Sequence, residues 1–355
     1  MEYELFIKKI FDHRDKNLPF VVYAMPNSNS IHALFQKDLT AHSPDGFTEN
    51  GFVFSPFNVE MPSFFMAEKN SESAVCEFTK PEVAAAPVKI KPRPSERDHY
   101  IKLVSKTIES IKKRQATKIV ISRKSDFELA HFSLEQLIER LFSSYNAAFR
   151  YIWYHPETQL WCGATPELLV QIANNSFKTM ALAGTQPVTN RLPVHWGPKE
   201  MDEQQLVTDS IIDSLQRVTS VLKISNPHTH QAGSVLHLRT DITGMLKSGK
   251  ATLSSIAAAL HPTPAVCGSP KKNARDFILK NEGYNREFYT GFLGPILDNG
   301  NAASLMVNLR CMKIENTQAR IFVGGGITIG SQPAEEWEET KNKMQTMLHL
   351  LQPML

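Results

Sequence analysis

The spacing of apolar and polar residues along the chain predicts a mixture of strands and helices. Short runs of β-branched and aromatic residues, bounded by Gly, Pro or Asn, predict strands. These runs are Phe20–Tyr23, Gly51–Phe54, Lys118–Ser122, Phe149–Tyr154, Gln159–Cys162, Phe177–Ala181 and Arg320–Val323. Because the strands are many and do not alternate regularly with helices, we predict an α+β architecture and not a doubly wound parallel sheet.

Helices are predicted where apolar residues recur every three or four positions. Ile101, Val104, Ile108 and Ile111 form one such stripe. A capping box from Ser133 to Gln136 begins a further helix. A long helix is expected from Pro198 to about Leu222, and a last helix follows Ser331 and Pro333.

The pattern changes near residue 95. Residues 1–80 are rich in Phe and Ser, and the segment after them carries Pro81, Pro87, Pro92 and Pro94 around an alanine run. Proline at this density favours an extended connector. We expect residues 1–95 to add strands to the main fold and not to fold alone, with residues 96–351 as the catalytic domain.

Composition narrows the possible functions. The 355 residues are 42% hydrophobic, which is enough for a large core, and 39 Lys and Arg balance 36 Asp and Glu. This balance argues against a nucleic-acid partner. The four cysteines form no C-x-x-C pair, and no run of 18 uncharged apolar residues occurs. We therefore expect a cytoplasmic protein without a disulfide scaffold, a zinc ribbon or a membrane partner.

The last helix places charges where its core-facing residues lie. At about 100° per residue, Glu336, Glu339 and Lys343 share a face with Met347 and Leu350. Charges on a buried face are costly unless they hold an ion or a ligand. The three glycines at 324–326 predict a turn before this helix, with backbone N–H groups free to bind an anion. Ordinary ion pairs along a helix at the edge of the domain are the alternative interpretation.

The long helix from Pro198 repeats this arrangement. Glu200 and Glu203 lie at the start of a stripe that continues with apolar residues such as Val207 and Ile211. The helix dipole alone would explain carboxylates in the first turn. Together with the last helix, however, Glu203 and Glu339 could hold a magnesium ion through few protein ligands, with water and substrate completing its coordination.

Lys118 and Glu167 are candidates for proton transfer. Lys118 begins an apolar strand, where partial desolvation would lower its pKa and make it a base. Glu167 lies between a strand and an apolar run. The alternatives are a lysine at a sheet edge that reaches water and a carboxylate in the first turn of a helix.

Several short motifs together resemble the chorismate-utilising enzymes, collinearly over about residues 96–351. This family includes isochorismate, salicylate, anthranilate and aminodeoxychorismate synthases. The motifs are TKIVISR around Lys118, GATPELL around Glu167, LAGTQ around Gly184, LHLRT around His237, HPTPAVCG from His261, NREFYTG from Asn285, NLR ending at Arg310, and the GGGI and EEWEETKNK segments near the C-terminus. The resemblance implies a single large domain of extensive antiparallel sheets packed with helices.

Within that family the resemblance to isochorismate synthases is the nearest. It implies that Lys118 activates water for attack at C2 of chorismate, while protonated Glu167 donates a proton to the departing C4 hydroxyl. It also implies Mg²⁺ on Glu203 and Glu339, with Glu200 and Glu336 holding metal-bound water. The implied substrate-binding residues are Gly184, Thr185, His237, Ala265, Tyr289, Arg310, Gly324, Gly326 and Lys343.

The resemblance leaves alternatives open. A salicylate synthase would go on to eliminate pyruvate, and a silent chorismate-binding relative would lack the catalytic groups. Lys118 argues against an anthranilate-type enzyme, so no amidotransferase subunit is expected, and we expect a monomer. The family's Glu-His pair is Glu203-Gln204 here, and His261 is more typical of a core histidine. Whether the product supplies menaquinone, a siderophore or salicylate stays open.

Overall fold

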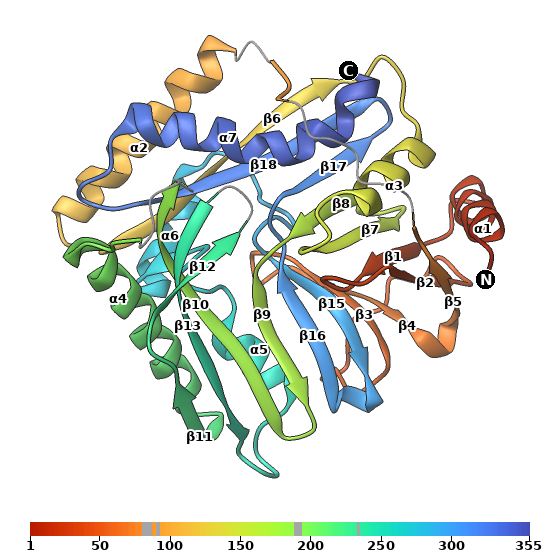
Figure 1. Cartoon of the computed structure of the whole chain (residues 1–355), viewed down its shortest axis with the longest axis horizontal. Helices are drawn as coiled ribbons and strands as arrows, with labels where there is room; N and C mark the ends of the chain where they lie inside the picture. The colour runs from red at the N-terminus through yellow and green to blue at the C-terminus, as the bar shows by residue number, and fades with distance from the viewer. Residues whose placement is uncertain (80–86, 90–92, 188–193, 233–234) are drawn as a thin grey trace.

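Two large antiparallel β-sheets with helices on their outer sides form the core of the molecule (Figure 1). The computed structural model describes residues 1–79, 87–89, 93–187, 194–232 and 235–355. The first sheet has the order β14 (Gly268–Ser269), β6 (Lys118–Glu128), β18 (Gln318–Ile327), β17 (Cys311–Glu315), β8 (Gln159–Thr165), β7 (Phe149–His155), β1 (Phe20–Ala24), β2 (Ser30–Gln36) and β5 (Ser71–Glu77). The predicted α+β class with extensive antiparallel sheets is confirmed.

The second sheet is formed by most of the remaining strands. Its order is β11 (Thr219–Ile224), β13 (Val235–Leu246), β10 (Ser176–Pro187), β9 (Leu168–Ala173), β16 (Ala302–Val307), β15 (Phe292–Leu297), β3 (Gly51–Ser55) and β4 (Phe64–Ala67). β12 (His228–Ala232) also pairs with β13. Neighbours in this sheet are often distant in sequence, so the sheet depends on long-range contacts.

The helices cover the sheets from outside. They are α1 (Tyr3–Asp15), α2 (Pro94–Lys112), α3 (Leu134–Ser143), α4 (Pro198–Leu215), α5 (Leu253–Leu260), α6 (Lys271–Asn281) and α7 (Pro333–Leu351), with short 3₁₀ turns at Glu68–Asn70, Asp298–Gly300 and Gln352–Met354. Figure 1 shows α7 lying across β6, β18 and β17 of the first sheet, whereas α4 follows the β10 and β13 side of the second sheet. No helix in the described part of the chain is long and apolar enough to cross a bilayer.

Aromatic side chains fill the space between the two sheets. Phe54 of β3 stacks on Phe288 with ring centroids 4.1 Å apart, and Trp161 of β8 stacks on Phe322 of β18 at 5.3 Å. All four rings are buried. Large rings bury much apolar area, and their stacking adds a smaller, directional contribution. Strands such as β7 are buried on both faces, which explains why Phe149–His155 is a nearly continuous apolar run.

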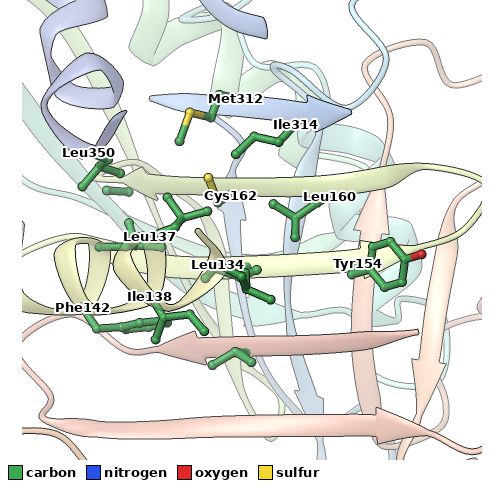
Figure 2. Close-up of a cluster of buried hydrophobic side chains, with 14 of the residues drawn as sticks. Leu134, Leu137, Ile138, Phe142, Tyr154, Leu160, Cys162, Met312, Ile314 and Leu350 are labelled. Atoms are coloured by element: carbon green, nitrogen blue, oxygen red, sulfur yellow. The ribbon is translucent and has the colours of Figure 1, made fainter. Parts of the chain in front are cut away.

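A second cluster packs α3 and α7 against the outer face of the first sheet (Figure 2). Leu137 and Ile138 of α3 are fully buried there, close to Leu350 of α7. The helix begins as predicted, since the Ser133 hydroxyl accepts a hydrogen bond from the Gln136 N–H. This packing fixes the C-terminal half of α7, whose first half carries the charged residues of interest.

The N-terminal strands pair with the strands that follow the connector. β1 pairs with β7 in the first sheet, and β3 pairs with β15 in the second. Phe52 and Phe54 of β3 contribute to the aromatic cluster between the sheets. Residues 1–79 therefore supply part of both sheets.

Two of the predicted elements are wrong. The helix from Pro198 ends at Leu215 and not near Leu222, because Thr219–Ile224 forms strand β11 beside β13. The glycines at 324–326 form no turn, since they lie inside β18 and pair with Ser122, Ile121 and Val120 of β6. At position 326 a larger residue would clash with a neighbour, because a Cβ at Gly326 would lie 2.7 Å from Cε of Lys118.

Candidate active site

A cavity of about 300 Å³ lies where strands of both sheets meet α4 and α7. Its volume is at the lower end of the range typical of small-molecule sites. It brings together every site residue named from the sequence whose side chain is described. These are Lys118, Glu167, Gly184, Glu200, Glu203, His237, Ala265, Tyr289, Arg310, Gly324, Gly326, Glu336, Glu339 and Lys343.

Thr185 is the remaining candidate, and its side chain lies outside the described residues. Its backbone lies in β10 opposite His237 of β13. The preceding residue, Gly184, forms a bulge in β10 with φ +65°. A Cβ at Gly184 would lie 3.3 Å from Cβ of Glu200, so the glycine allows α4 to approach the strand closely.

Lys118 extends from the first residue of β6 into this cavity. The strand lies between β14 and β18, so Lys118 does not occupy the sheet edge that one alternative interpretation required. Its Nζ donates a hydrogen bond of 2.8 Å to Oε1 of Glu203, and its side chain is 13% exposed. The lysine is therefore largely shielded from water and paired with a carboxylate of α4.

Glu167 lies in the short connection between β8 and β9, not in the first turn of a helix. Its carbonyl accepts a hydrogen bond of 2.9 Å from the Val307 N–H, which ties this connection to β16. Burial raises the pKa of the Glu167 carboxyl to about 7, although the positive charges of Lys118 and Arg310 oppose the shift. A substantial fraction of Glu167 is therefore protonated at neutral pH, as a general acid requires.

Four carboxylates from two helices face the cavity. Glu200 and Glu203 come from α4, whereas Glu336 and Glu339 come from α7. Burial raises the pKa of Glu336, and the charge of Glu339 raises it further, against a hydrogen bond of 2.7 Å from the Ser331 hydroxyl. Burial acts in the same direction on Glu339, but Lys343 outweighs it and lowers that pKa.

Carboxylate oxygens are the type of ligand that a hard divalent cation prefers. Magnesium is usually bound by one or two carboxylates and keeps several waters. Among the described residues, no three His, Cys, Asp or Glu side chains converge into a metal-binding cluster. Glu203 and Glu339 each have a lysine partner, which neutralises charge at the positions that the sequence assigned to the metal.

Lys343 links α7 to β18. Its Nζ lies 2.5 Å from Oε1 of Glu339 and donates a hydrogen bond of 3.0 Å to the Gly324 carbonyl. Gly324 thus contributes its carbonyl to this contact, while its position in the β6 and β18 ladder excludes the predicted glycine turn. Lys343 is a partly buried cation with two acceptors already in place.

Arg310 is a cation in the cavity whose side chain has no acceptor among the residues that the structure describes. In the described part of the chain its guanidinium makes neither a hydrogen bond nor an ion pair, and its backbone has φ +46°. Burial lowers the pKa of Arg310, while Tyr289, Glu339 and Glu167 oppose this shift. Burial also raises the pKa of the nearby Tyr289 hydroxyl, so this group is neutral. A planar guanidinium without a partner is suited to a carboxylate ligand.

The two histidines named from the sequence differ in their surroundings. His237 lines the cavity, and its Nδ1 lies 3.2 Å from the Gly184 carbonyl. Burial lowers the pKa of His237, so its imidazole is neutral at pH 7. His261 lies outside this cavity, where its Nε2 contacts the Pro56 carbonyl at 3.1 Å and burial lowers its pKa to about 4. His261 is a core residue.

Gln204, at the position where the resemblance implies a histidine, faces the sheet and not the cavity. It is 1% exposed, and its Nε2 donates hydrogen bonds of 3.0 Å to the Ala181 carbonyl and to the Thr240 hydroxyl. These contacts fix α4 against β10 and β13. Gln204 therefore supports α4 and does not line the cavity.

Several lining residues were not identified from the sequence. They are Val120, Pro166, Leu182, Ala183, His230, Val266, Thr290, Leu309, Thr328 and Ser331. His230 reaches the cavity because β12 pairs it with His237, a register that no local pattern reveals. Ser331 was assigned only to the start of the last helix. A Ser or Thr next to a proposed metal carboxylate is the kind of signal that could have identified it.

Residues 60–352 match the model of the chorismate binding enzymes. Isochorismate synthase DhbC of Bacillus subtilis is 35% identical over 199 residues, which are 53% of this chain and 50% of that protein. Isochorismate synthase EntC of Escherichia coli K12 is 31% identical over 267 residues, 72% of this chain and 67% of EntC. The chain thus aligns with half to two thirds of the length of these relatives.

Solved structures show the same fold over nearly the whole chain. A structure described as the 2,3-dihydroxybenzoate-specific isochorismate synthase DhbC from Bacillus anthracis superposes with a TM-score of 0.81 at 26% identity, covering 98% of this chain and 99% of that one. The menaquinone-specific isochorismate synthase MenF from Escherichia coli superposes with a TM-score of 0.77, covering 94% and 88%. At 21% identity, the second likeness concerns the fold alone.

Proposed function

Because this chain belongs to the chorismate binding enzyme family, we propose that it is an isochorismate synthase, an isomerase that converts chorismate to isochorismate. One observation carries the proposal. A single cavity holds a carboxyl group whose pKa is about 7, Glu167, together with a shielded lysine, Lys118. The exchange of one hydroxyl for another requires an acid that is protonated near neutral pH and a base beside the attacking water.

In the proposed reaction Lys118 acts as the base. It accepts a proton from the water that attacks C2, and Glu167 donates its proton to the C4 hydroxyl, which departs as water. The raised pKa of Glu167 supports the second role, since a substantial fraction of this carboxyl carries a proton at neutral pH. The neutral amine of Lys118 is the form that accepts the proton from water, and the 2.8 Å contact with Glu203 holds the side chain inside the cavity.

We propose that Mg²⁺ is the cofactor, held by Glu203 and Glu339, with Glu200 and Glu336 as acceptors for its waters. The raised pKa of Glu336, caused by burial and by Glu339, supports this assignment, because a cation would offset that repulsion. When bound, the metal would neutralise carboxylate charge and fix the substrate ring. Lys118 pairs with Glu203 and Lys343 pairs with Glu339, which holds the two proposed metal-binding carboxylates in position.

Recognition of the dianionic substrate falls to Arg310 and its neighbours. The guanidinium of Arg310 has no acceptor in the described part of the chain and lies in the cavity beside Tyr289 and Lys343. We assign the enolpyruvyl carboxylate to these three residues. Gly184, Thr185, His237, Ala265, Gly324 and Gly326 complete the proposed substrate contacts by their position on the cavity wall and, for Thr185, beside it.

Product analysis tests the proposal directly. Purified protein is incubated with chorismate and Mg²⁺, and the products are separated by liquid chromatography and identified by mass. Isochorismate without pyruvate is expected. Salicylate with stoichiometric pyruvate would assign the chain to the salicylate synthases, and no consumption of chorismate would leave only a binding role.

A further inference from the structure

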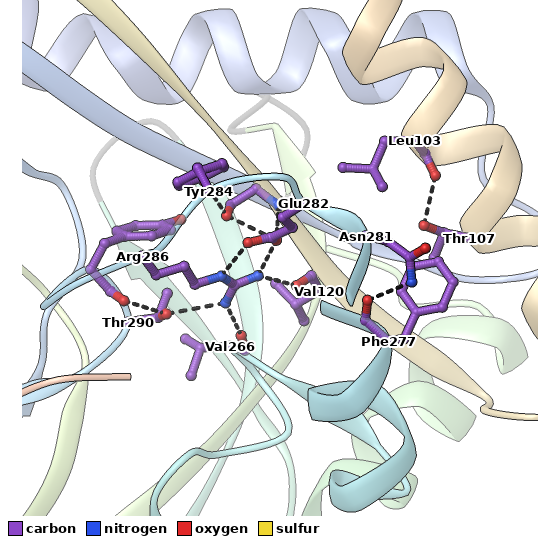
Figure 3. A network of polar contacts seen from close by, with 12 residues as sticks. Leu103, Thr107, Val120, Val266, Phe277, Asn281, Glu282, Tyr284, Arg286 and Thr290 are labelled. Carbon is purple, nitrogen blue, oxygen red and sulfur yellow. Dashed lines mark hydrogen bonds and ion pairs between the residues drawn. The ribbon is translucent and has the colours of Figure 1, made fainter. Parts of the chain in front are cut away.

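The side chain of Arg286 lies behind the cavity and uses every hydrogen-bond donor of its guanidinium (Figure 3). Arginine has five N–H groups. Here Nε donates to Oε2 of Glu282 at 2.8 Å, Nη1 donates to the Val266 carbonyl and the Thr290 hydroxyl at 3.1 Å each, and Nη2 donates to the Val120 carbonyl at 2.7 Å and to Oε1 of Glu282. The residue is 2% exposed.

Three of these acceptors belong to residues that line the cavity. Val120 lies in β6, two residues after Lys118, and Val266 lies in the segment between α5 and β14. Thr290 precedes β15 of the second sheet and directly follows Tyr289. One guanidinium thus joins three chain segments that are far apart in sequence. Neither Arg286 nor Glu282 lines the cavity itself.

Glu282 extends the same network to β6. Its Oε1 accepts hydrogen bonds from the backbone N–H and the hydroxyl of Ser122, at 2.7 and 3.0 Å. The Ser122 hydroxyl also lies 2.6 Å from the Tyr284 hydroxyl. Strand β6 is therefore held at two positions, Val120 and Ser122, immediately after the proposed base.

We propose that Arg286, with Glu282 as its counterion, is a positioning residue that holds Val120, Val266 and Thr290 together and so sets the place of Lys118 and Tyr289. This inference rests on the proposed function for its effect on catalysis, but the holding of the three segments does not depend on the reaction. A buried ion pair is weak evidence for a stabilising role. The positioning role is instead inferred from the three further hydrogen bonds that Arg286 donates to residues of the cavity wall.

The substitution Arg286→Lys separates the effect of the positive charge from the effect of the hydrogen-bond geometry. An ammonium keeps the positive charge beside Glu282 but offers three donors from a single point, not five from a planar fork. It cannot reach both Glu282 oxygens, two backbone carbonyls and a hydroxyl. The acceptors that it leaves buried and unpaired would loosen the wall.

Arg286→Lys is compared with Arg150→Lys to test this role. Arg150 is also buried, at 3% exposed, and donates to the carbonyls of Phe142 and Ser28 at 2.8 and 2.7 Å, away from the cavity. The control therefore makes the same substitution at a buried arginine whose two carbonyl contacts lie away from the cavity. Hydrogen exchange of peptides covering residues 118–122, 263–268 and 289–291 is measured together with kcat and KM for chorismate.

For Arg286→Lys we expect faster amide exchange in these peptides and a fall in kcat/KM of about tenfold or more, since small displacements of catalytic groups are costly. Arg150→Lys is expected to leave the amide exchange rates of these peptides and kcat/KM within about twofold of the wild-type values, even if it lowers the unfolding midpoint. Unchanged exchange in Arg286→Lys would overturn the holding role. Faster exchange with unchanged kcat and KM would overturn the catalytic consequence.

Glu282→Gln provides a second variant if Arg286→Lys does not fold. It keeps the shape of the side chain and removes its charge, so the same exchange and kinetic changes are expected in weaker form. If the wild-type protein forms no isochorismate, the proposed function fails, while the exchange comparison still decides whether Arg286 holds the three segments.

Discussion

Lys118 and Glu203 form an ion pair with an N–O distance of 2.8 Å, although 85 residues separate them in the sequence. The pair joins β6 of the first sheet to α4 beside the second. It also connects the proposed base with a carboxylate proposed to bind Mg²⁺. The groups proposed for proton transfer and for metal binding are therefore adjacent in this cavity, and separate substitutions are needed to distinguish them.

Lys118→Ala and Glu167→Gln should each lower the forward and the reverse rate together. The reaction exchanges one hydroxyl for another, so acid and base interchange roles when its direction reverses. The expected loss in kcat is roughly 10²-fold or more for each variant. Chorismate binding, measured by calorimetry, should be affected less, since Arg310 and Lys343 are intact. Near-normal turnover with weak binding in Lys118→Ala would make this lysine a charge partner for the substrate.

The pH profile should reflect Glu167. Its pKa is raised to about 7 by burial, and the proton is needed for catalysis. The forward rate should therefore fall as the pH rises through about 7, because the carboxylate form of Glu167 cannot donate a proton. Glu167→Gln should abolish this alkaline decline in the residual activity. A decline that persists in Glu167→Gln would assign it to another group.

The magnesium assignment predicts the effect of two conservative substitutions. Glu203→Gln and Glu339→Gln keep the shape of the side chain but remove the charge that a hard cation needs. Each should abolish most Mg²⁺-dependent turnover and weaken Mg²⁺ binding in calorimetry, with an unchanged circular dichroism spectrum. Glu338→Gln, on the exposed side of the same helix, is the matched control. Wild-type metal affinity in both cavity variants would contradict the assignment.

Ammonium should not change the product. With chorismate, Mg²⁺ and ammonium salts, the protein is expected to form isochorismate and no anthranilate, because Lys118 is placed to activate water. Chromatography of the product with fluorescence detection of anthranilate provides the measurement. Formation of anthranilate in proportion to ammonium would show that Lys118 does not select the nucleophile.

Packing beneath α7 should depend on Leu137. This side chain is 0% exposed in the cluster between α3, α7 and the first sheet, so Leu137→Ala leaves a cavity. We expect a loss of about 2–5 kcal/mol in the free energy of unfolding, measured by denaturant titration. Leu206→Ala is the control, since Leu206 of α4 is 52% exposed and its truncation removes little buried area. Equal losses in the two variants would contradict this packing.

Much of the fold and site follows from local patterns in the sequence. Alternation and apolar runs predicted strands such as β1, β3, β6 and β7, and the Ser133 cap predicted where α3 begins. The spacing of charges on α7 correctly placed Glu336, Glu339 and Lys343 toward one cavity. These features depend on backbone periodicity within one element, which a sequence expresses directly.

Other features arise only when distant segments meet. Gly324 and Gly326 lie in a strand because β6 pairs with β18 and Lys118 needs the space beside Gly326. Glu167 has a pKa of about 7 because both sheets bury it, and Val120, Val266 and Thr290 share one guanidinium from Arg286. The sequence by itself determined the elements and the chemical groups of this protein. Tertiary structure decided their partners and burial, because these depend on long-range pairing that local spacing does not encode.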